Sequence, residues 1–276
     1  MKIDSHQHFW KFNTTDYAWI DETMRILRRD YLPDELETTL KEEGFDGCIS
    51  VQARQSLQET KWLLQLADQY SWIKGIVGWV DLCSPGIENE LESIARNKKL
   101  VGIRHVLHDE TDDYFMLKPE FKNGLRCLEK FGLTYDLLLF PKHLKIAASL
   151  LEEFPDQPFV IDHISKPLIR QGFMEPWSTN IRHIASYPNV YCKLSGMVTE
   201  ADPNNWCQET FNSYLDVVFE AFGPDRLMIG SDWPVCLLGG NYNRVTSIVR
   251  NYISNLDPES INKIMGENCK TFYKLT

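Results

Sequence analysis

Short apolar runs alternate with longer amphipathic stretches along the whole chain. The apolar runs are rich in Val, Ile, Leu and Cys, which is the pattern of strands buried on both faces. They predict eight strands: Ile3–Phe9, Gly47–Gln52, Ile73–Val80, Val101–Val106, Leu133–Phe140, Phe159–Ile164, Val190–Ser195 and Leu227–Ser231.

The stretches between these runs repeat their apolar residues at helical spacing. Residues such as Gly132 and Pro155 mark helix ends. The pattern predicts helices over Glu35–Glu43, Gln58–Tyr70, Glu88–Asn97, Pro119–Phe131, His143–Phe154, Pro176–Ser186, Gln208–Phe222, Tyr242–Ile253 and Glu259–Phe272.

Eight strands that alternate with helices predict a TIM-type (β/α)8 barrel in the α/β class. A doubly wound sheet would need a glycine-rich turn after the first strand, where the sequence has Ser5-His6-Gln7-His8-Phe9 instead. The length of 276 residues suits a single barrel, and no repeat or linker divides the chain. We therefore expect one domain over residues 1–276.

Composition and charge argue against some kinds of binding partner. The formal net charge of −10 disfavours nucleic acid and anionic membranes, because both bind basic surfaces. No apolar run approaches the ~20 residues that span a bilayer. Seven scattered cysteines without a Cys-x-x-Cys pair, and an N-terminus without an apolar signal segment, favour a soluble cytoplasmic protein. Homo-oligomerisation stays open.

Ionisable residues collect at the carboxyl ends of the predicted strands, which form the mouth of such a barrel. His6 and His8 are two apart on the first strand, so their side chains point to the same side. A pair of this kind is more often a surface feature, but His163 and Asp232 end two later strands and join it. Four buried polar groups need partners, which favours a catalytic or metal site.

Seven further residues near the strand ends are candidate substrate-binding groups, each with a structural alternative. A cation or amide could reach a substrate oxygen, or could only pair with a carboxylate such as Asp81 or Asp136. An indole could stack on a sugar ring or could only fill space, and filling space is our preferred interpretation for Trp79. The seven candidates are Gln52, Arg54, Arg104, His105, Lys193, Trp10 and Trp233.

Several segments resemble the amidohydrolase superfamily and, more narrowly, its sugar-lactonase branch, which contains L-fucono-lactonase-like and L-rhamnono-lactonase-like enzymes. The resemblance spans the whole chain, and its first and last motifs are more specific for the superfamily than for the branch. The segments are Ile3–Trp10, Gly102–His105, Asp162–Pro167, Gly230–Pro234 and the terminal Gly266–Tyr273.

The resemblance also limits the metal chemistry. Binuclear members of the superfamily carry a carboxylated lysine on strand four and a histidine on strand five, where this chain has Arg104 and Asp136 or their neighbours. We therefore expect at most one divalent metal, Zn²⁺, held by His6, His8, His163 and Asp232. Some related lactonases lack the same ligands and work without an essential metal, so whether the metal is required stays open.

The function implied by the resemblance is hydrolysis of the ester bond of a small lactone. Asp232 would act as general base and acid, while His6, His8 and His163, with or without one Zn²⁺, would polarise the carbonyl. The few cations near the mouth favour a neutral aldonolactone, such as L-fuconolactone or L-rhamnonolactone, over a dicarboxylate. Three loops are expected to cover the mouth: Asn13–Tyr31, Leu107–Lys118 and Lys166–Glu175.

Two other functions stay open at this point. A metal-dependent decarboxylase or hydratase of an aromatic-derived acid could use the same histidines and Asp232, and it would depend strictly on added metal. A non-catalytic sugar-acid binding protein would bind a lactone without hydrolysing it, although the intact Asp232 argues against lost catalysis.

Overall fold

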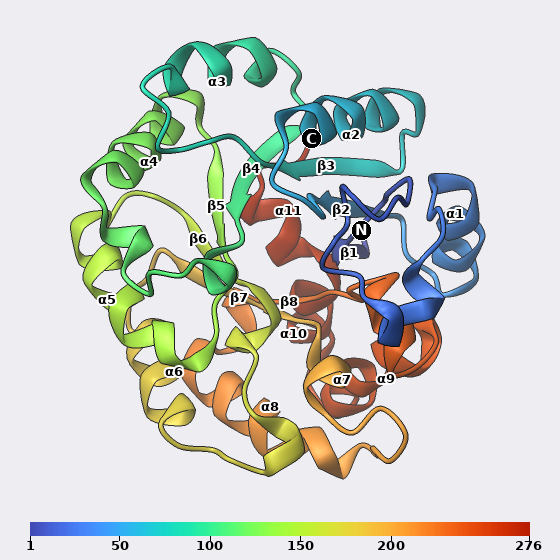
Figure 1. Cartoon of the computed structure of the whole chain (residues 1–276). Helices are drawn as coiled ribbons and strands as arrows, with labels where there is room; N and C mark the ends of the chain where they lie inside the picture. Colours follow the sequence, from blue (N-terminus) through green and yellow to red (C-terminus); the bar gives the residue numbers. More distant parts are fainter.

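The computed structural model describes residues 1–276, and its eight strands form one sheet in the order β1 to β8. Each strand runs parallel to the next. The backbone N–H of His8 donates to Trp233 O (2.7 Å) and that of Asp232 donates to His6 O (2.8 Å), which joins the last strand to the first. Helices surround this ring (Figure 1), so the predicted (β/α)8 barrel is confirmed.

All eight predicted strands are present, and each ends one to three residues earlier than the apolar pattern predicts. The chain leaves the sheet at these points to build the mouth of the barrel. The strands are β1 Ile3–Gln7, β2 Gly47–Val51, β3 Ile73–Gly78, β4 Leu100–His105, β5 Thr134–Leu137, β6 Phe159–Ile161, β7 Val190–Leu194 and β8 Leu227–Ile229.

Eight of the nine predicted helices agree with the structure to within two residues at each end. The short α7, Met197–Glu200, was not predicted, because a single turn carries no helical periodicity. The others are α1 Pro33–Glu42, α2 Leu57–Gln69, α3 Ile87–Ala95, α4 Pro119–Phe131, α5 Leu144–Glu153, α6 Trp177–Ala185, α8 Glu209–Phe222 and α9 Tyr242–Ile253.

The ninth prediction, one continuous helix over Glu259–Phe272, is wrong. The segment divides into α10 (Pro258–Asn262), a π-helical turn (Lys263–Glu267) and α11 (Asn268–Phe272). Gly266 in the turn lies against the N-terminal residues, and a Cβ there would overlap the carbonyl oxygen of Met1. The contact between the two chain ends therefore requires glycine at this position.

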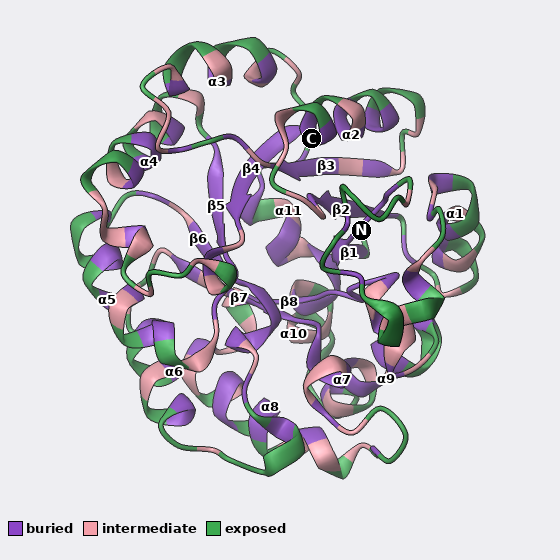
Figure 2. Cartoon of the chain, in the orientation of Figure 1, coloured by how far each residue is buried: buried purple, intermediate pink, exposed green.

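Apolar side chains fill the molecule in two clusters. The larger one packs the sheet against the surrounding helices, whose exposed residues face outward (Figure 2). The smaller one combines strand residues such as Ile3 and Met228 with Phe272 and Tyr273 at the C-terminus. The C-terminal segment thus closes the barrel from the end opposite the mouth, and α11 is visible through the ring of strands in Figure 1. No helix has the length and apolar character needed to cross a membrane.

Candidate active site

A pocket of about 400 Å³ opens at the carboxyl ends of the strands. This volume lies in the range of small-molecule sites. Each of the three loops expected to cover the mouth contributes to its lining: Trp19 and Met24 come from the first, His108 and Asp109 from the second, and Lys166 from the third.

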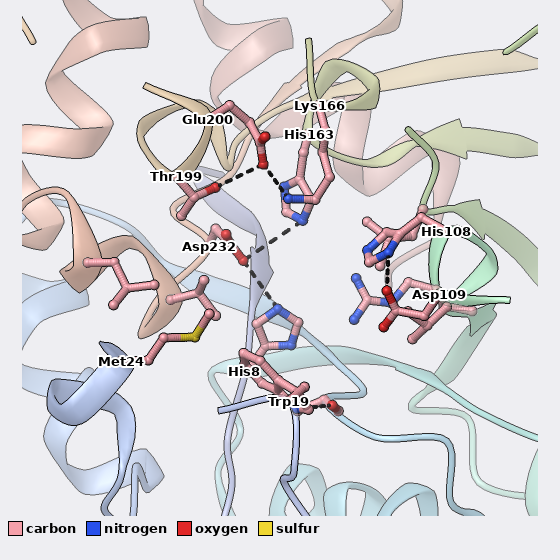
Figure 3. Close-up of a pocket in the computed structure, with 16 residues that line it drawn as sticks. His8, Trp19, Met24, His108, Asp109, His163, Lys166, Thr199, Glu200 and Asp232 are labelled. Carbon is pink, nitrogen blue, oxygen red and sulfur yellow. Dashed lines mark hydrogen bonds and ion pairs between the residues drawn. The ribbon is translucent and has the colours of Figure 1, made fainter. Parts of the chain in front are cut away.

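The four predicted catalytic residues come together at this pocket. The Nε2 atoms of His6 and His8 lie 3.2 Å apart. Asp232 Oδ1 lies 3.2 Å from His8 Nε2, 3.8 Å from His6 Nε2 and 3.9 Å from His163 Nε2. His8, His163 and Asp232 line the pocket (Figure 3), while His6 lies buried behind them. The ion pairs and hydrogen bonds of the Asp232 carboxylate all involve Oδ1, which leaves Oδ2 available.

Unusual backbone positions two of these side chains. His163, Ile164, Ser165 and Lys166 are four successive non-glycine residues with φ between 47° and 62°, and Asp232 has φ 58°. The left-handed region disfavours side chains with a Cβ, and such strain concentrates at functional sites. The tight turns after β6 and β8 therefore exist at a cost in stability, and they aim His163 and Asp232 at the same point.

The second ring nitrogen of each histidine is also held. His8 Nδ1 lies 2.8 Å from Val51 O, a pure acceptor, so Nδ1 carries the proton and donates it. His163 Nδ1 lies 2.9 Å from Ser195 Oγ, and His6 Nδ1 lies 3.3 Å from Asp162 Oδ1. Histidines that bind a metal through Nε2 are oriented by partners of this kind at Nδ1.

These contacts test whether the residues fit a zinc ion. The proton on His8 Nδ1 is donated to Val51 O, and the other ring nitrogen, Nε2, faces an acceptor, Asp232 Oδ1, at 3.2 Å. Two acceptors at this distance need a cation or a second proton between them. Donors on a tetrahedral zinc ion lie roughly 3.3 Å apart. The group of His6, His8 and Asp232 therefore fits one Zn²⁺ in donor type and spacing, and His163 Nε2 lies beside it, 3.9 Å from Asp232 Oδ1.

Burial sets the charge state of the site. It holds the pKa of His6 and of His163 well below the ordinary histidine value, so both rings are neutral at pH 7. Burial alone would raise the pKa of Asp232, but His163 and His8 outweigh it and lower that pKa. An ionised carboxylate thus faces neutral imidazoles, which is the protonation state that both metal binding and proton acceptance require.

Arg104 is the single one of the seven predicted substrate-binding residues that lines the pocket. Its guanidinium donates to Asp162 Oδ2 (3.0 Å) and to Gln52 Oε1 (2.7 and 2.9 Å). The carboxylate partner is therefore Asp162, and not Asp81 or Asp136 as the alternative interpretation held. Gln52 lies behind Arg104 and orients it.

The structure places the other candidates away from the residues that line the pocket. Lys193 is fully buried in the barrel, because its ammonium pairs with two carboxylates there. Trp10 and Trp233 both pack edge-on against Tyr31 in the core. Arg54 forms an ion pair with an aspartate of the first loop, and His105 turns toward Glu110 at 2.7 Å. None of these side chains reaches the pocket.

Several residues that the sequence did not single out do reach the pocket, and they come from the loops and from α7. Lys166 donates to Glu200 (2.6 Å), and His108 lies 2.7 Å from Asp109. These four residues and Thr199 line the mouth of the pocket. They lie outside the predicted strands, so the apolar pattern did not identify them. Lys166 could have been found, since it follows His163 in the motif that carries the family resemblance.

One side of the pocket is apolar and the other side is polar. In Figure 3, Met24 lies on one side of the line between His8 and Asp232, and His108 and Asp109 lie on the other. Val235 and Leu238, which follow β8, add further apolar lining. A ligand in this pocket thus meets both an apolar surface (Met24, Val235 and Leu238) and a group of hydrogen-bonding side chains.

The strand assignments locate the two positions at which the family resemblance places the additional ligands of binuclear members. β4 contains no lysine and β5 contains no histidine. These two strands carry Arg104 and Asp136, as the strand pattern predicts.

Comparisons with known proteins agree with this fold. A protein of Burkholderia multivorans called L-fucono-1,5-lactonase is 37% identical over 286 aligned residues, covering 100% of this chain and 96% of that protein. A protein of the same name from Burkholderia ambifaria is 34% identical and covers 99% of this chain and 96% of its own length. A crystal structure of an amidohydrolase from Burkholderia multivorans with bound zinc superimposes with a TM-score of 0.97 at 37% identity, covering 100% of both chains.

The family model described as Amidohydrolase matches residues 3–275. This match and the full-length relatives confirm the resemblance that the sequence motifs indicate. The chain belongs to the amidohydrolase family.

Proposed function

We propose that the protein hydrolyses a sugar lactone, with a neutral 6-deoxy aldonolactone such as L-fucono-1,5-lactone as its substrate. The observation that carries the proposal is the convergence of three imidazoles and one ionised carboxylate at the base of the pocket. The full-length likeness to L-fucono-1,5-lactonases supports the choice of lactone.

In this proposal Asp232 moves the proton. Its free Oδ2 accepts a proton as a water oxygen attacks the lactone carbonyl carbon, giving a tetrahedral oxyanion. The ring C–O bond then breaks, and Asp232 returns the proton to the departing alkoxide. The product is the open hydroxy acid, and the carboxylate is regenerated.

The positive charge of Arg104, next to His6 at the pocket wall, stabilises the oxyanion. When bound by His6, His8, His163 and Asp232, Zn²⁺ would polarise the carbonyl and add to this stabilisation. His8 and His163 keep their Nε2 atoms directed at the reacting group because Val51 and Ser195 hold their Nδ1 atoms.

The polar part of the pocket recognises the ring hydroxyls. The carboxylates of Glu200 and Asp109 accept hydrogen bonds from hydroxyl groups, and Lys166 donates to hydroxyl oxygens. His108, whose Nδ1–H donates to Asp109, accepts a hydroxyl hydrogen through Nε2. Cations and carboxylates alternate here, so the surface suits a neutral polyol rather than a dicarboxylate.

The experiment that tests the proposal is a pH-indicator assay on L-fucono-, L-rhamnono-, L-galactono- and D-arabinonolactones, with chelated protein and again with Zn²⁺ restored. We expect acid release from at least the 6-deoxy lactones. Silence across the whole panel in both conditions would contradict the proposal and favour the decarboxylase or hydratase. Tight lactone binding without acid release would favour the non-catalytic binding protein.

The role of Asp232 is tested by Asp232→Asn. We expect its turnover to fall by about 10² to 10⁴-fold, because the amide cannot accept the proton, while the circular dichroism spectrum stays unchanged. Asp156→Asn is the matched control, since Asp156 is exposed between α5 and β6, at the end opposite the mouth. Turnover of Asp232→Asn within threefold of the wild type would remove Asp232 from this role.

The apolar surface formed by Met24, Val235 and Leu238 makes a separate prediction about specificity. We expect a preference of roughly 10- to 100-fold in kcat/KM for L-fucono-1,5-lactone over L-galactono-1,5-lactone, which differs by one added hydroxyl on the methyl carbon. Leu238→Asn should reduce this ratio, whereas Leu168→Asn, outside the pocket, should not. An equal ratio in the wild type would show that the apolar surface does not receive the methyl group.

A further inference from the structure

A continuous series of buried polar groups runs from the C-terminal segment through the barrel to His6. The Tyr273 hydroxyl donates to Asp136 Oδ2 at 2.9 Å, and the Lys193 ammonium donates to the same oxygen at 2.5 Å. Lys193 Nζ also lies 3.1 Å from Asp162 Oδ1 and 3.2 Å from His6 Nδ1. Asp162 Oδ1 in turn lies 3.3 Å from the same His6 nitrogen.

This series holds two anions and one cation at full burial, and Arg104 on Asp162 Oδ2 supplies the second cation. Buried ion pairs contribute little net stability, because desolvation offsets most of their attraction. A layer of branched apolar side chains would fill a barrel interior without this desolvation cost. Stability alone therefore does not account for these groups, whereas a requirement for fixed geometry at His6 does.

We propose that Tyr273 and Asp136 are positioning residues for the active site, acting through Lys193 and Asp162 on the imidazole of His6. This inference rests on the proposed function for its catalytic readout. The Asp136 carboxylate is shared between the tyrosine hydroxyl and the ammonium, so it fixes where the ammonium lies. The ammonium and Asp162 then fix the His6 ring from its Nδ1 side.

Tyr273 is suited to this task by its surroundings. Its ring packs among strand residues of the barrel interior and lies edge-on to Phe272 at 4.8 Å. Burial and the neighbouring Asp136 hold the pKa of its phenol well above the ordinary value, so the hydroxyl remains a donor at every working pH. The contact thereby connects a residue three positions before the last one, Thr276, with the catalytic centre at the opposite end of the barrel.

The test compares Tyr273→Phe with Tyr191→Phe. Both changes remove only a hydroxyl from the same apolar cluster, but the Tyr191 hydroxyl makes no hydrogen bond in the structure, and its ring packs on Phe272 at 4.9 Å. For Tyr273→Phe we expect kcat to fall up to about tenfold, the low end for residues that support a metal ligand. KM should stay unchanged, because Tyr273 touches no substrate. Tyr191→Phe should keep both constants.

A second readout does not depend on the lactone. Zn²⁺ affinity, measured by competition with a chromophoric chelator, should weaken up to about tenfold in Tyr273→Phe and remain unchanged in Tyr191→Phe. Asp136→Asn should weaken it further, since the ammonium then loses one of its two carboxylate partners. If the wild type opens no lactone, the proposed function fails and this affinity alone decides the inference; if the wild type binds no Zn²⁺, kcat decides it.

The inference is overturned if Tyr273→Phe keeps kcat and Zn²⁺ affinity within twofold of the wild type. It is also overturned if both variants lose activity in proportion to their loss of thermal stability, because the hydroxyl would then serve folding alone. A wild type with neither activity nor Zn²⁺ binding overturns it as well, since the series would then have no site to position.

Discussion

At the scale of single residues, the site depends on which atom of each side chain is already engaged. The histidines direct Nε2 at Asp232 because Val51, Ser195 and Asp162 hold the other ring nitrogen. Asp232 and His163 reach their places on left-handed backbone. Groups outside the pocket lining thus orient the side chains that carry the chemistry.

Gly196, just after β7, offers a test of how the position of His163 affects activity. Its φ is 63°, and a Cβ there would lie 2.6 Å from His163 Cγ and closer still to Nδ1. We expect Gly196→Ala to reduce kcat/KM about 100-fold, because a displacement near 1 Å at a reacting group has effects of this size. The measurement is steady-state lactone hydrolysis beside chemical denaturation.

The control is Gly172→Ala. Gly172 has φ 70°, but a Cβ there would have nothing within 4 Å. Both variants should lose about 1–2 kcal/mol of stability from the left-handed backbone, and only Gly196→Ala should lose activity. Equal activities for the two would show that Gly196 serves the turn and not His163.

At the scale of elements, the mouth is built by connections that are anchored to the barrel through buried groups. Glu59 on α2 accepts hydrogen bonds from the backbone N–H groups of Ala53 and Arg54, directly after β2, and from the Tyr17 hydroxyl of the first loop. Burial raises the pKa of Glu59 from its ordinary 4.5 to about 7. One carboxyl group therefore joins two segments at the mouth, and its charge changes near neutral pH.

The sign of its effect on stability follows from the direction of the shift. A raised pKa in the folded state means that the contribution of Glu59 is fully present below about pH 4.5 and is lost as the pH rises through about 7. We expect about 3 kcal/mol of pH-dependent unfolding free energy from this group over that range. Glu59→Gln should remove this component, as measured by urea unfolding at pH 5, 6, 7 and 8.

Glu129→Gln serves as the control for Glu59, since Glu129 is exposed near the end of α4 and should leave the pH profile as in the wild type. If the Glu59→Gln profile ran parallel to that of the wild type, the Glu59 carboxyl would titrate as an ordinary exposed group, and the anchoring argument would fail.

At the scale of the whole molecule, the barrel brings His6 and His8 from one end of the sequence to Asp232 at the other. A cation bound by these three residues would link the end of β1 to the turn after β8. A ligand that binds only the folded state stabilises it, by about 2.7 kcal/mol at 100 times its Kd. Removing or adding Zn²⁺ is therefore expected to change the thermal stability of the protein as well as its activity.

We expect Zn²⁺ to raise the Tm of chelated protein by about 5–10 °C at such a concentration, as measured by scanning calorimetry. His8→Gln should abolish the increase, because the ring nitrogen at the centre of the site is lost. His183→Gln, on the exposed face of α6, should retain it. An increase that persisted in His8→Gln would place the ion elsewhere on the protein.

The sequence by itself determined the barrel, because hydrophobic periodicity is local and survives without tertiary information. It also determined that His6, His8, His163 and Asp232 meet, since residues at the carboxyl ends of parallel strands must share one mouth. It placed the strand ends too late, as in β6, where apolar composition continues through Ile164 although the backbone has already turned left-handed.

Only the tertiary structure decided the depth and partners of the remaining polar groups. Lys193 lies below the mouth because strand stagger and inward side-chain alternation place it beside Asp136 and Asp162, which come from β5 and the turn after β6. The positions of Glu200 and His108 depend on loops whose course no periodicity describes. A sequence pattern fixes which residues a strand presents, whereas pairing depends on the register between strands, and register is a property of the assembled barrel.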